Sequence, residues 1–196
     1  MVKEVSKERK IFSQIEFHRK MSNIDRLSDV LKNKKYSLAE HSYYVTTMFQ
    51  DFAIIEDIAY TVNDLYFIAR HDFLEVFTGD LSSVVKNFSD KTKEAWETIE
   101  NEVMKTYKLD CYLLFNDKEL NEELNEEVIK LLKACDLLDL YLFCIEETTL
   151  GNNLYEMAYI LEEIFKQIRD LEVCSVTNFM LKRTRDYKDQ MNYYKV

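Results

Sequence analysis

The chain of 196 residues contains no proline and only two glycines. Sheets and turn-rich folds ordinarily use more of both residues, because these residues mark tight turns and chain breaks. Their scarcity therefore predicts an all-α fold. Hydrophobic residues make up 47% of the chain, which is ample for a sizeable core, and the length suits a single domain.

Positive charge is also scarce. The chain has 26 Lys and Arg residues against 36 Asp and Glu residues, for a formal net charge of −10, and no long basic stripe. Tight binding to bulk nucleic acid depends on many Lys and Arg contacts with phosphates, so we do not expect this class of partner. An acidic protein can still bind a small phosphate compound where a metal ion and a few local cations set the field.

Long apolar runs are missing too. No stretch of about 18 uncharged apolar residues is present to span a membrane, and residues 1–8 lack the apolar segment of a signal peptide. No Cys-x-x-Cys pair occurs among Cys111, Cys135, Cys144 and Cys174. Free thiols in a reducing compartment fit this distribution. We therefore expect a soluble, cytoplasmic protein with no membrane partner.

Apolar residues recur at helical spacing along most of the chain. Helices are expected over residues 8–30, 38–54, 57–77, 90–107, 119–147 (as one helix or two) and 154–172, with a short element over 108–118. Ser37 and Glu40 have the spacing of a capping box at the second helix. Gly79 follows the third helix, in the position where a glycine commonly ends one. The polar, tyrosine-rich tail from Lys182 onward is expected to be peripheral.

Most of the chain's chemistry lies between His71 and Asp80. His71 and Asp72 are adjacent, Glu75 follows one helical turn later, and Asp80 follows Gly79. Positions i and i+3 or i+4 share a helix face, so we expect Glu75 near His71 and Asp72. Adjacent positions point about 100° apart at 3.6 residues per turn. His71 and Asp72 can therefore reach one ion only from a helix end or beside a partner helix.

This run resembles the HD domain superfamily of metal-dependent phosphohydrolases. The family pattern is a first His, a His-Asp pair and a later Asp, which match His41, His71-Asp72 and Asp136. The extension through Glu75 and Asp80, and the run 141–153, are similar to the small bacterial 5'-deoxynucleotidases. The resemblance covers roughly residues 10–170. It implies a single-domain HD-type helical bundle over residues 1–196, with a peripheral C-terminal tail.

By this resemblance the metal ligands are His41, His71, Asp72 and Asp136. Two imidazoles and two carboxylates suit one divalent transition metal (Mn, Co, Ni, Fe or Zn) better than Ca or Mg. The chain has only three histidines. Two-metal members of the superfamily use additional histidines, so a mononuclear site is favoured and His18 is expected to be structural or on the surface.

Asp136 and Asp139 both interrupt the apolar stripe of residues 131–142. A carboxylate that enters a core needs a metal, a cation or several donors as partners. Nothing in the pattern itself distinguishes the two, and the family match selects Asp136.

Two further carboxylates are candidates for catalysis. Glu75 would orient or deprotonate the attacking water, and Asp80 would hold that water or protonate the leaving sugar oxygen; assigning these roles needs geometry. For substrate binding, Arg26 matches an arginine of the bacterial relatives and is expected to bind the phosphate. Leu27 stands where those relatives carry a tryptophan, so the preference for deoxyribose is expected to be less sharp.

The leading hypothesis is a 5'-nucleotidase that hydrolyses deoxyribonucleoside 5'-monophosphates to nucleoside and phosphate. One alternative keeps the metal site but acts on another small phosphoester or on dNTPs, although dNTP hydrolases of this superfamily are generally longer. The other alternative is a non-catalytic helical nucleotide-binding module, which the presence of Glu75 and all four ligands argues against. The resemblance also implies a homodimer.

Overall fold

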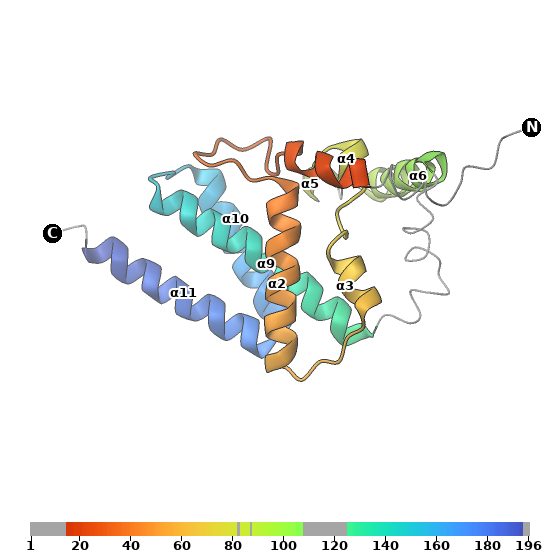
Figure 1. Cartoon of the computed structure of the whole chain (residues 1–196). Coiled ribbons are helices and arrows are strands. Elements are labelled where there is room, and N and C mark those ends of the chain that lie inside the picture. The colour runs from red at the N-terminus through yellow and green to blue at the C-terminus, as the bar shows by residue number, and fades with distance from the viewer. Residues whose placement is uncertain (1–14, 82, 87, 108–124, 194–196) are drawn as a thin grey trace, which may run out of the picture. The chain divides into compact units, whose positions relative to one another are not determined.

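The computed structural model describes residues 15–81, 83–86, 88–107 and 125–193. Within these ranges the chain forms helices joined by turns and loops, with no strand (Figure 1). The all-α prediction is confirmed. The described residues belong to two compact units, one within residues 1–29, 37–40 and 70–123, and the other within residues 30–36, 41–69 and 124–196. The assignment of residues 1–196 to one domain with a peripheral tail stays a prediction.

The second unit is organised around α9 (Glu126–Thr149), against which α10 (Tyr155–Asp170) and α11 (Cys174–Tyr193) pack (Figure 1). Apolar residues lie on several sides of α9, and a helix of this kind is buried. The core of this unit draws side chains from all three helices and from α2 (Leu38–Ile55), among them Val45, Phe49, Leu131, Leu138, Ile168 and Met180. The central helix α9 thus brings Asp139 and Glu147 into the interior and leaves Asp136 partly exposed.

The first unit contains η1 (Met21–Asn23), α4 (Glu75–Thr78), α5 (Ser83–Lys86) and α6 (Asp90–Tyr107). Its smaller core is formed by Met21, Leu38, Phe73, Leu74 and Met104. The helix predicted over residues 8–30 is shorter than expected among the described residues. Residues 15–20 are helical, η1 follows, and Ile24 is already extended.

The single helix predicted over residues 57–77 is wrong. Helix α3 spans only Val62–Ile68, and residues 69–74 form turns before α4 begins. The start is late because Thr61 and Asp64 form a capping box, with Thr61 N–H donating to the Asp64 carboxylate at 2.6 Å. The break has no Gly or Pro, so packing overrides local propensity: Ile68 belongs to one core and Phe73 to the other. His71 and Asp72 therefore lie on a turn.

Other predicted features are confirmed. Helix α2 begins with the expected capping box, in which Ser37 N–H donates to Glu40 at 3.1 Å and Glu40 N–H donates to Ser37 Oγ at 3.3 Å. Gly79 ends α4 with φ of 77°. Helix α6 has the predicted bounds. The element predicted over residues 108–118 lies outside the described residues.

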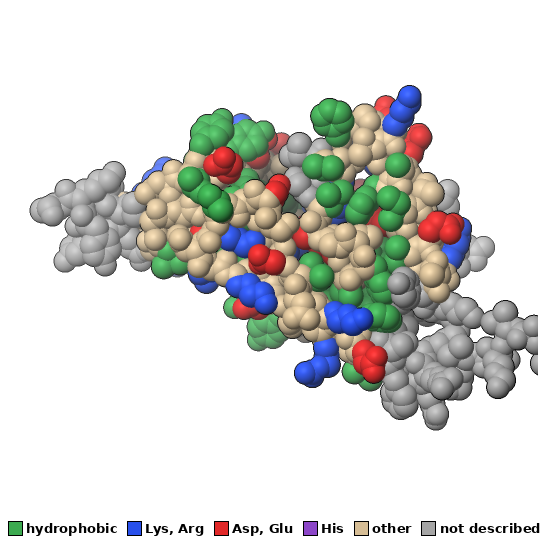
Figure 2. Space-filling model, turned by 90° about the horizontal axis from the view of Figure 1, so that it is seen from above, with side chains coloured by type: hydrophobic (Ala, Val, Ile, Leu, Met, Phe, Trp, Pro, Cys, Tyr) green, Lys and Arg blue, Asp and Glu red, His purple; other side chains and the backbone are tan. Residues whose placement is uncertain are grey.

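Charged side chains of both signs are interspersed on the face drawn in Figure 2, and no basic stripe crosses that face. None of the described helices is long and apolar enough to cross a membrane.

Candidate metal and catalytic site

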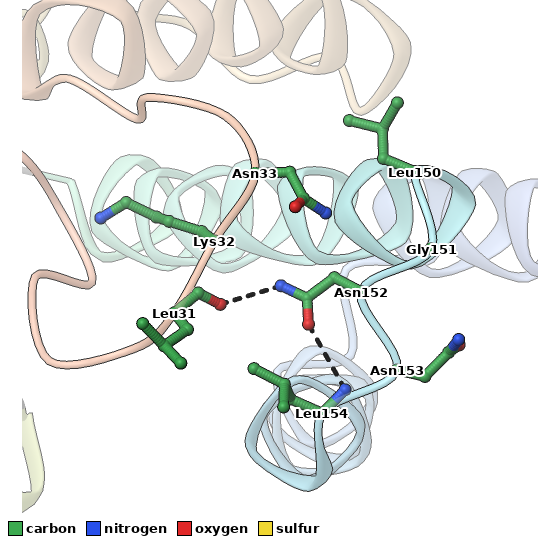
Figure 3. A pocket seen from close by; sticks show the side chains of 8 residues that line it. All are labelled: Leu31, Lys32, Asn33, Leu150, Gly151, Asn152, Asn153 and Leu154. Atoms are coloured by element: carbon green, nitrogen blue, oxygen red, sulfur yellow. Dashed lines mark hydrogen bonds between the residues drawn. The ribbon is translucent and has the colours of Figure 1, made fainter.

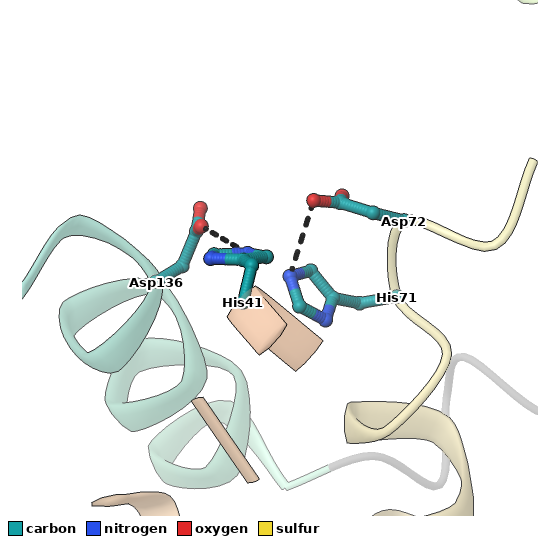
Figure 4. A group of neighbouring side chains, drawn as sticks. All are labelled: His41, His71, Asp72 and Asp136. Carbon is teal, nitrogen blue, oxygen red and sulfur yellow. Dashed lines mark ion pairs between the residues drawn. The ribbon is translucent and has the colours of Figure 1, made fainter. Parts of the chain in front are cut away.

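His41 lies in the first turn of α2 and has no exposed surface. Its Nε2 atom lies 3.1 Å from Oδ1 of Asp136, and its Nδ1 atom lies 2.8 Å from Oδ2 of Asp139. Asp136 and Asp139 are three residues apart on α9 and so share a face of that helix. The imidazole therefore has a different carboxylate at each of its two nitrogens (Figure 4 draws the pair with Asp136).

The two carboxylates of α9 differ in their surroundings. The Asp139 side chain is only 8% exposed, and its Oδ2 atom also accepts a hydrogen bond from the Tyr36 hydroxyl at 2.6 Å. The Asp136 side chain is 35% exposed. Asp139 thus has the donors that a buried carboxylate needs, which supports the choice of Asp136 as the metal ligand.

The turn of residues 69–74 carries the other histidine and aspartate of the motif. His71 Nε2 lies 3.4 Å from Oδ2 of Asp72 (Figure 4). The same Asp72 oxygen accepts a charged hydrogen bond from Nη1 of Arg26. Within the first unit, the predicted phosphate-binding arginine is therefore bonded to a predicted metal ligand.

Glu75 is the first residue of α4 and is buried. Its Oε1 atom accepts a hydrogen bond from Lys86 Nζ at 3.1 Å, whereas its buried Oε2 atom has no hydrogen-bond partner among the described residues. Burial, and next the charge of Asp72, raise the pKa of Glu75 to about 7, although Arg26 and Lys86 act in the opposite direction. A carboxyl group with such a pKa can exchange a proton near neutral pH.

Asp80 follows Gly79 and accepts a hydrogen bond at its Oδ2 atom from the backbone N–H of Leu27 at 2.8 Å. Leu27 has φ of 51°, a left-handed conformation that is uncommon for a residue with a side chain. Strained residues of this kind persist where the surrounding structure holds them, often at ligand sites. The neighbours Arg26 and Leu27 thus bond to Asp72 and Asp80 respectively.

His41, His71, Asp72 and Asp136 form the His/Asp group able to hold a metal ion (Figure 4). Their donor atoms fit the expected ion, because two imidazoles and two carboxylates suit borderline divalent metals. The surroundings of His41 fit as well. Histidines that bind metals usually donate their other ring N–H to a carboxylate or carbonyl, and Asp139 lies at that nitrogen.

Several contacts at these residues were not predicted from the sequence, among them those of Asp139 with His41 and Tyr36 and the bond from Lys86 to Glu75. Local sequence patterns do not predict these contacts, because each joins two residues that are not at the i, i+3 or i+4 spacing of one helix. His18 accepts a hydrogen bond from Arg70 Nε at 2.8 Å, in keeping with a structural residue.

A pocket of about 420 Å³ lies in the second unit, between the loop of residues 31–33 and the segment Leu150–Leu154 (Figure 3). Asn152 lines this pocket and donates a hydrogen bond to the Leu31 carbonyl at 2.9 Å. None of the site residues predicted from the sequence lines this pocket.

Comparison with known proteins assigns the chain to a family. The model of the YfbR-like 5'-deoxynucleotidases matches residues 13–187. A 5'-deoxynucleotidase of Enterobacter sp. (strain 638) is 28% identical over 134 residues, which cover 62% of this chain. The match spans 66% of that protein's length, just under two thirds.

Solved structures show the same fold. An HD-domain phosphohydrolase of Listeria innocua superposes with a TM-score of 0.71 at 24% identity, covering 90% of this chain and 89% of that one. The HD phosphohydrolase of cyanophage S-2L, solved with dA and one catalytic Zn²⁺ ion, gives a TM-score of 0.61 at 21% identity, with coverage of 89% and 96%. The predicted HD-type helical fold is confirmed. Since the family model matches most of its length, the chain belongs to the YfbR-like 5'-deoxynucleotidases, a family of metal-dependent HD-domain phosphohydrolases.

Proposed function

We propose that this chain hydrolyses deoxyribonucleoside 5'-monophosphates to deoxyribonucleoside and phosphate. The proposal rests on the surroundings of Glu75, a buried carboxylate three residues after Asp72. Its Oε2 atom has no hydrogen-bond partner among the described residues. Membership of the 5'-deoxynucleotidase family supports the reaction. The cyanophage relative, bound to dA and one Zn²⁺ ion, supports a deoxynucleoside product and a single metal ion.

In this proposal His41, His71, Asp72 and Asp136 hold one divalent transition metal. The ion, when bound, neutralises the phosphate charge and lowers the pKa of a coordinated water. Asp72 has a second role, because its bond to Arg26 keeps the guanidinium beside the metal ligands. A guanidinium presents five N–H donors in a fork that suits phosphate oxygens, so pairing with Asp72 is compatible with binding the substrate phosphate.

Glu75 accepts the proton of the attacking water. Only its ionised form can do so, and a pKa of about 7 gives a substantial ionised fraction at neutral pH. Lys86 fixes one oxygen of the carboxylate and leaves the other for the water. Asp80, held by the Leu27 N–H group, either orients that water or protonates the leaving sugar oxygen. The apolar side chain of Leu27 contacts the sugar.

The test is a phosphate-release screen of dNMPs, NMPs and dNTPs, with and without chelator, followed by re-addition of Mn, Co or Zn. We expect release from dNMPs that stops in chelator and returns with metal. Release from dNTPs alone would favour the triphosphate reaction, and binding without release would favour a non-catalytic module. Full activity after exhaustive chelation would refute the metal-dependent mechanism.

Alanine substitutions test which residues bind the metal. Replacing any of the four ligands should lower the metal content of the purified protein together with its activity. Asp51→Ala is the matched control, since Asp51 is an exposed carboxylate on the same helix as His41. It should leave metal content unchanged. The homodimer and the cytoplasmic location stay predictions.

A further inference from the structure

Tyr36, His41 and Asp139 form a buried hydrogen-bonded cluster in the second unit. Their exposed fractions are 4%, 0% and 6%. The Tyr36 hydroxyl lies 2.6 Å and His41 Nδ1 lies 2.8 Å from the same Asp139 oxygen, Oδ2, and these two groups are 3.1 Å from each other. The Tyr36 hydroxyl and the His41 imidazole therefore both contact the same carboxylate oxygen of Asp139.

The hydrogen-bonding capacities of the three groups favour one arrangement of the protons. An ionised carboxylate only accepts hydrogen bonds, a tyrosine hydroxyl has one proton to donate, and a neutral imidazole carries its proton on one nitrogen. For an ionised Asp139 and a neutral His41, this geometry assigns both donated hydrogen bonds to Asp139 and the imidazole proton to Nδ1. The lone pair of His41 then lies on Nε2, the nitrogen 3.1 Å from Oδ1 of Asp136. Two acceptors at that distance are suited to sharing a cation.

We propose that Asp139 is the positioning residue of the metal site and that Tyr36 holds Asp139 in place. Asp139 sets the tautomer and the ring orientation of His41, so that Nε2 is presented to the ion. This inference rests on the proposed role of His41 as a metal ligand and adds the two residues that act through it. The general precedent is that such partners of ligating histidines change metal affinity or activity by about 10- to 100-fold when replaced.

Tyr36 is itself held from two sides. Its ring stacks on Phe143 of α9 with centroids 4.2 Å apart and planes inclined by 12°. The loop before it is bound by Glu147, which accepts hydrogen bonds from the backbone N–H groups of Asn33 at 2.7 Å and Lys34 at 2.8 Å. The hydroxyl thus reaches Asp139 from a fixed position.

The main alternative is that the cluster only stabilises the fold. Two variants and a matched control separate the roles. Asp139→Asn keeps the shape of the side chain but removes the charge, and Tyr36→Phe removes one donor to Asp139. The control, Tyr141→Phe, removes the hydroxyl of a second buried tyrosine, which lies on α9 and is bonded to Thr184 at 2.6 Å and not to His41.

Zinc affinity is measured by competition with a chromophoric chelator, on protein whose folded fraction is checked by circular dichroism. We expect Asp139→Asn to weaken zinc binding by about 10- to 100-fold, Tyr36→Phe to weaken it by a smaller factor, and Tyr141→Phe to leave it unchanged. If Asp139→Asn does not fold, Tyr36→Phe still decides the question. Unchanged zinc affinity in both folded variants, or equal losses in the control, would overturn the proposal.

A second readout is independent of activity. Long-range ¹H–¹⁵N spectra of the zinc-loaded wild type should show His41 protonated at Nδ1 and bound through Nε2. Assignment by substitution is simple because the chain has three histidines. Zinc bound through Nδ1 would overturn the proposal. A wild type that binds zinc through His41 but releases no phosphate from dNMPs would refute the proposed function and leave the role of Asp139 standing.

Discussion

Glu147 is a carboxylate with no exposed surface that joins α9 to the loop of residues 31–34. It accepts three hydrogen bonds, from Asn33 N–H at 2.7 Å, Lys34 N–H at 2.8 Å and Asn152 Nδ2 at 2.9 Å. Glutamine has the same shape but only one acceptor oxygen. In Glu147→Gln the amide nitrogen must therefore face one of these donors.

The expected loss follows from these contacts. One charge-assisted hydrogen bond, typically about 1.5–3 kcal/mol, is replaced by a donor facing a donor, and the others become weaker neutral bonds. We predict that Glu147→Gln lowers the free energy of unfolding by about 2–4 kcal/mol. The neighbouring Glu146 is the control, because its half-exposed side chain pairs only with the Lys34 ammonium among the contacts described. Glu146→Gln should cost about 1 kcal/mol or less.

Urea unfolding of the three proteins at neutral and acid pH is the assay. Burial alone raises the pKa of Glu147, but the hydrogen bonds from Asn152, Asn33 and Lys34 outweigh it and leave the pKa below its ordinary value. The ionised carboxylate therefore stabilises the fold above that ordinary pKa, and its contribution is lost as the pH falls through the lowered one. The gap between wild type and Glu147→Gln should narrow in acid. Equal losses in both variants at neutral pH, or a gap that widens in acid, would refute this reasoning.

Three predictions concern catalysis. Glu75→Gln should reduce kcat by about 100-fold or more, as expected for loss of a general base, at unchanged metal content; loss of the metal would instead make Glu75 a ligand or its support. Arg26→Lys should raise KM for dNMPs or lower kcat, because an ammonium cannot replace the guanidinium fork; wild-type kinetics would limit Arg26 to its bond with Asp72. Leu27→Trp should raise the dNMP/NMP ratio of kcat/KM by roughly 5- to 150-fold, the range for leaving a ribose hydroxyl unpaired; an unmoved ratio would mean that the sugar is recognised elsewhere.

The fold class could be predicted from the sequence because its signals are local. Missing proline, scarce glycine and apolar residues at helical spacing all favour helices, and α2, α6 and α10 have nearly the predicted bounds. The turn of residues 69–74 could not be predicted in this way. Nothing in its composition breaks a helix, and the break depends on Ile68 and Phe73 packing into different cores. That competition is a property of the folded chain.

The candidate site, like the fold, could be predicted from the sequence only in part. The motif residues are recognisable because their order and spacing along the chain are visible in the sequence. Their partners are not, since Arg26 bonds to Asp72 across 46 positions and Leu27 bonds to Asp80 across 53. Periodicity contains no information about such pairs. They had to come from the family pattern or from the structure.

Asp136 and Asp139 show what this distinction means for chemistry. They are the same residue type, on one face of one helix, in the same apolar stripe, so no local property of the sequence separates them. They differ in the nitrogen of His41 that each one meets, 3.1 Å from Nε2 for Asp136 and 2.8 Å from Nδ1 for Asp139. In the proposed metal site, one nitrogen of a neutral imidazole carries the proton and the other binds the ion, so the two carboxylates have different proposed roles. The Tyr36 hydroxyl gives the buried Asp139 carboxylate a second donor, which supports the proposal that Asp136 is the oxygen ligand.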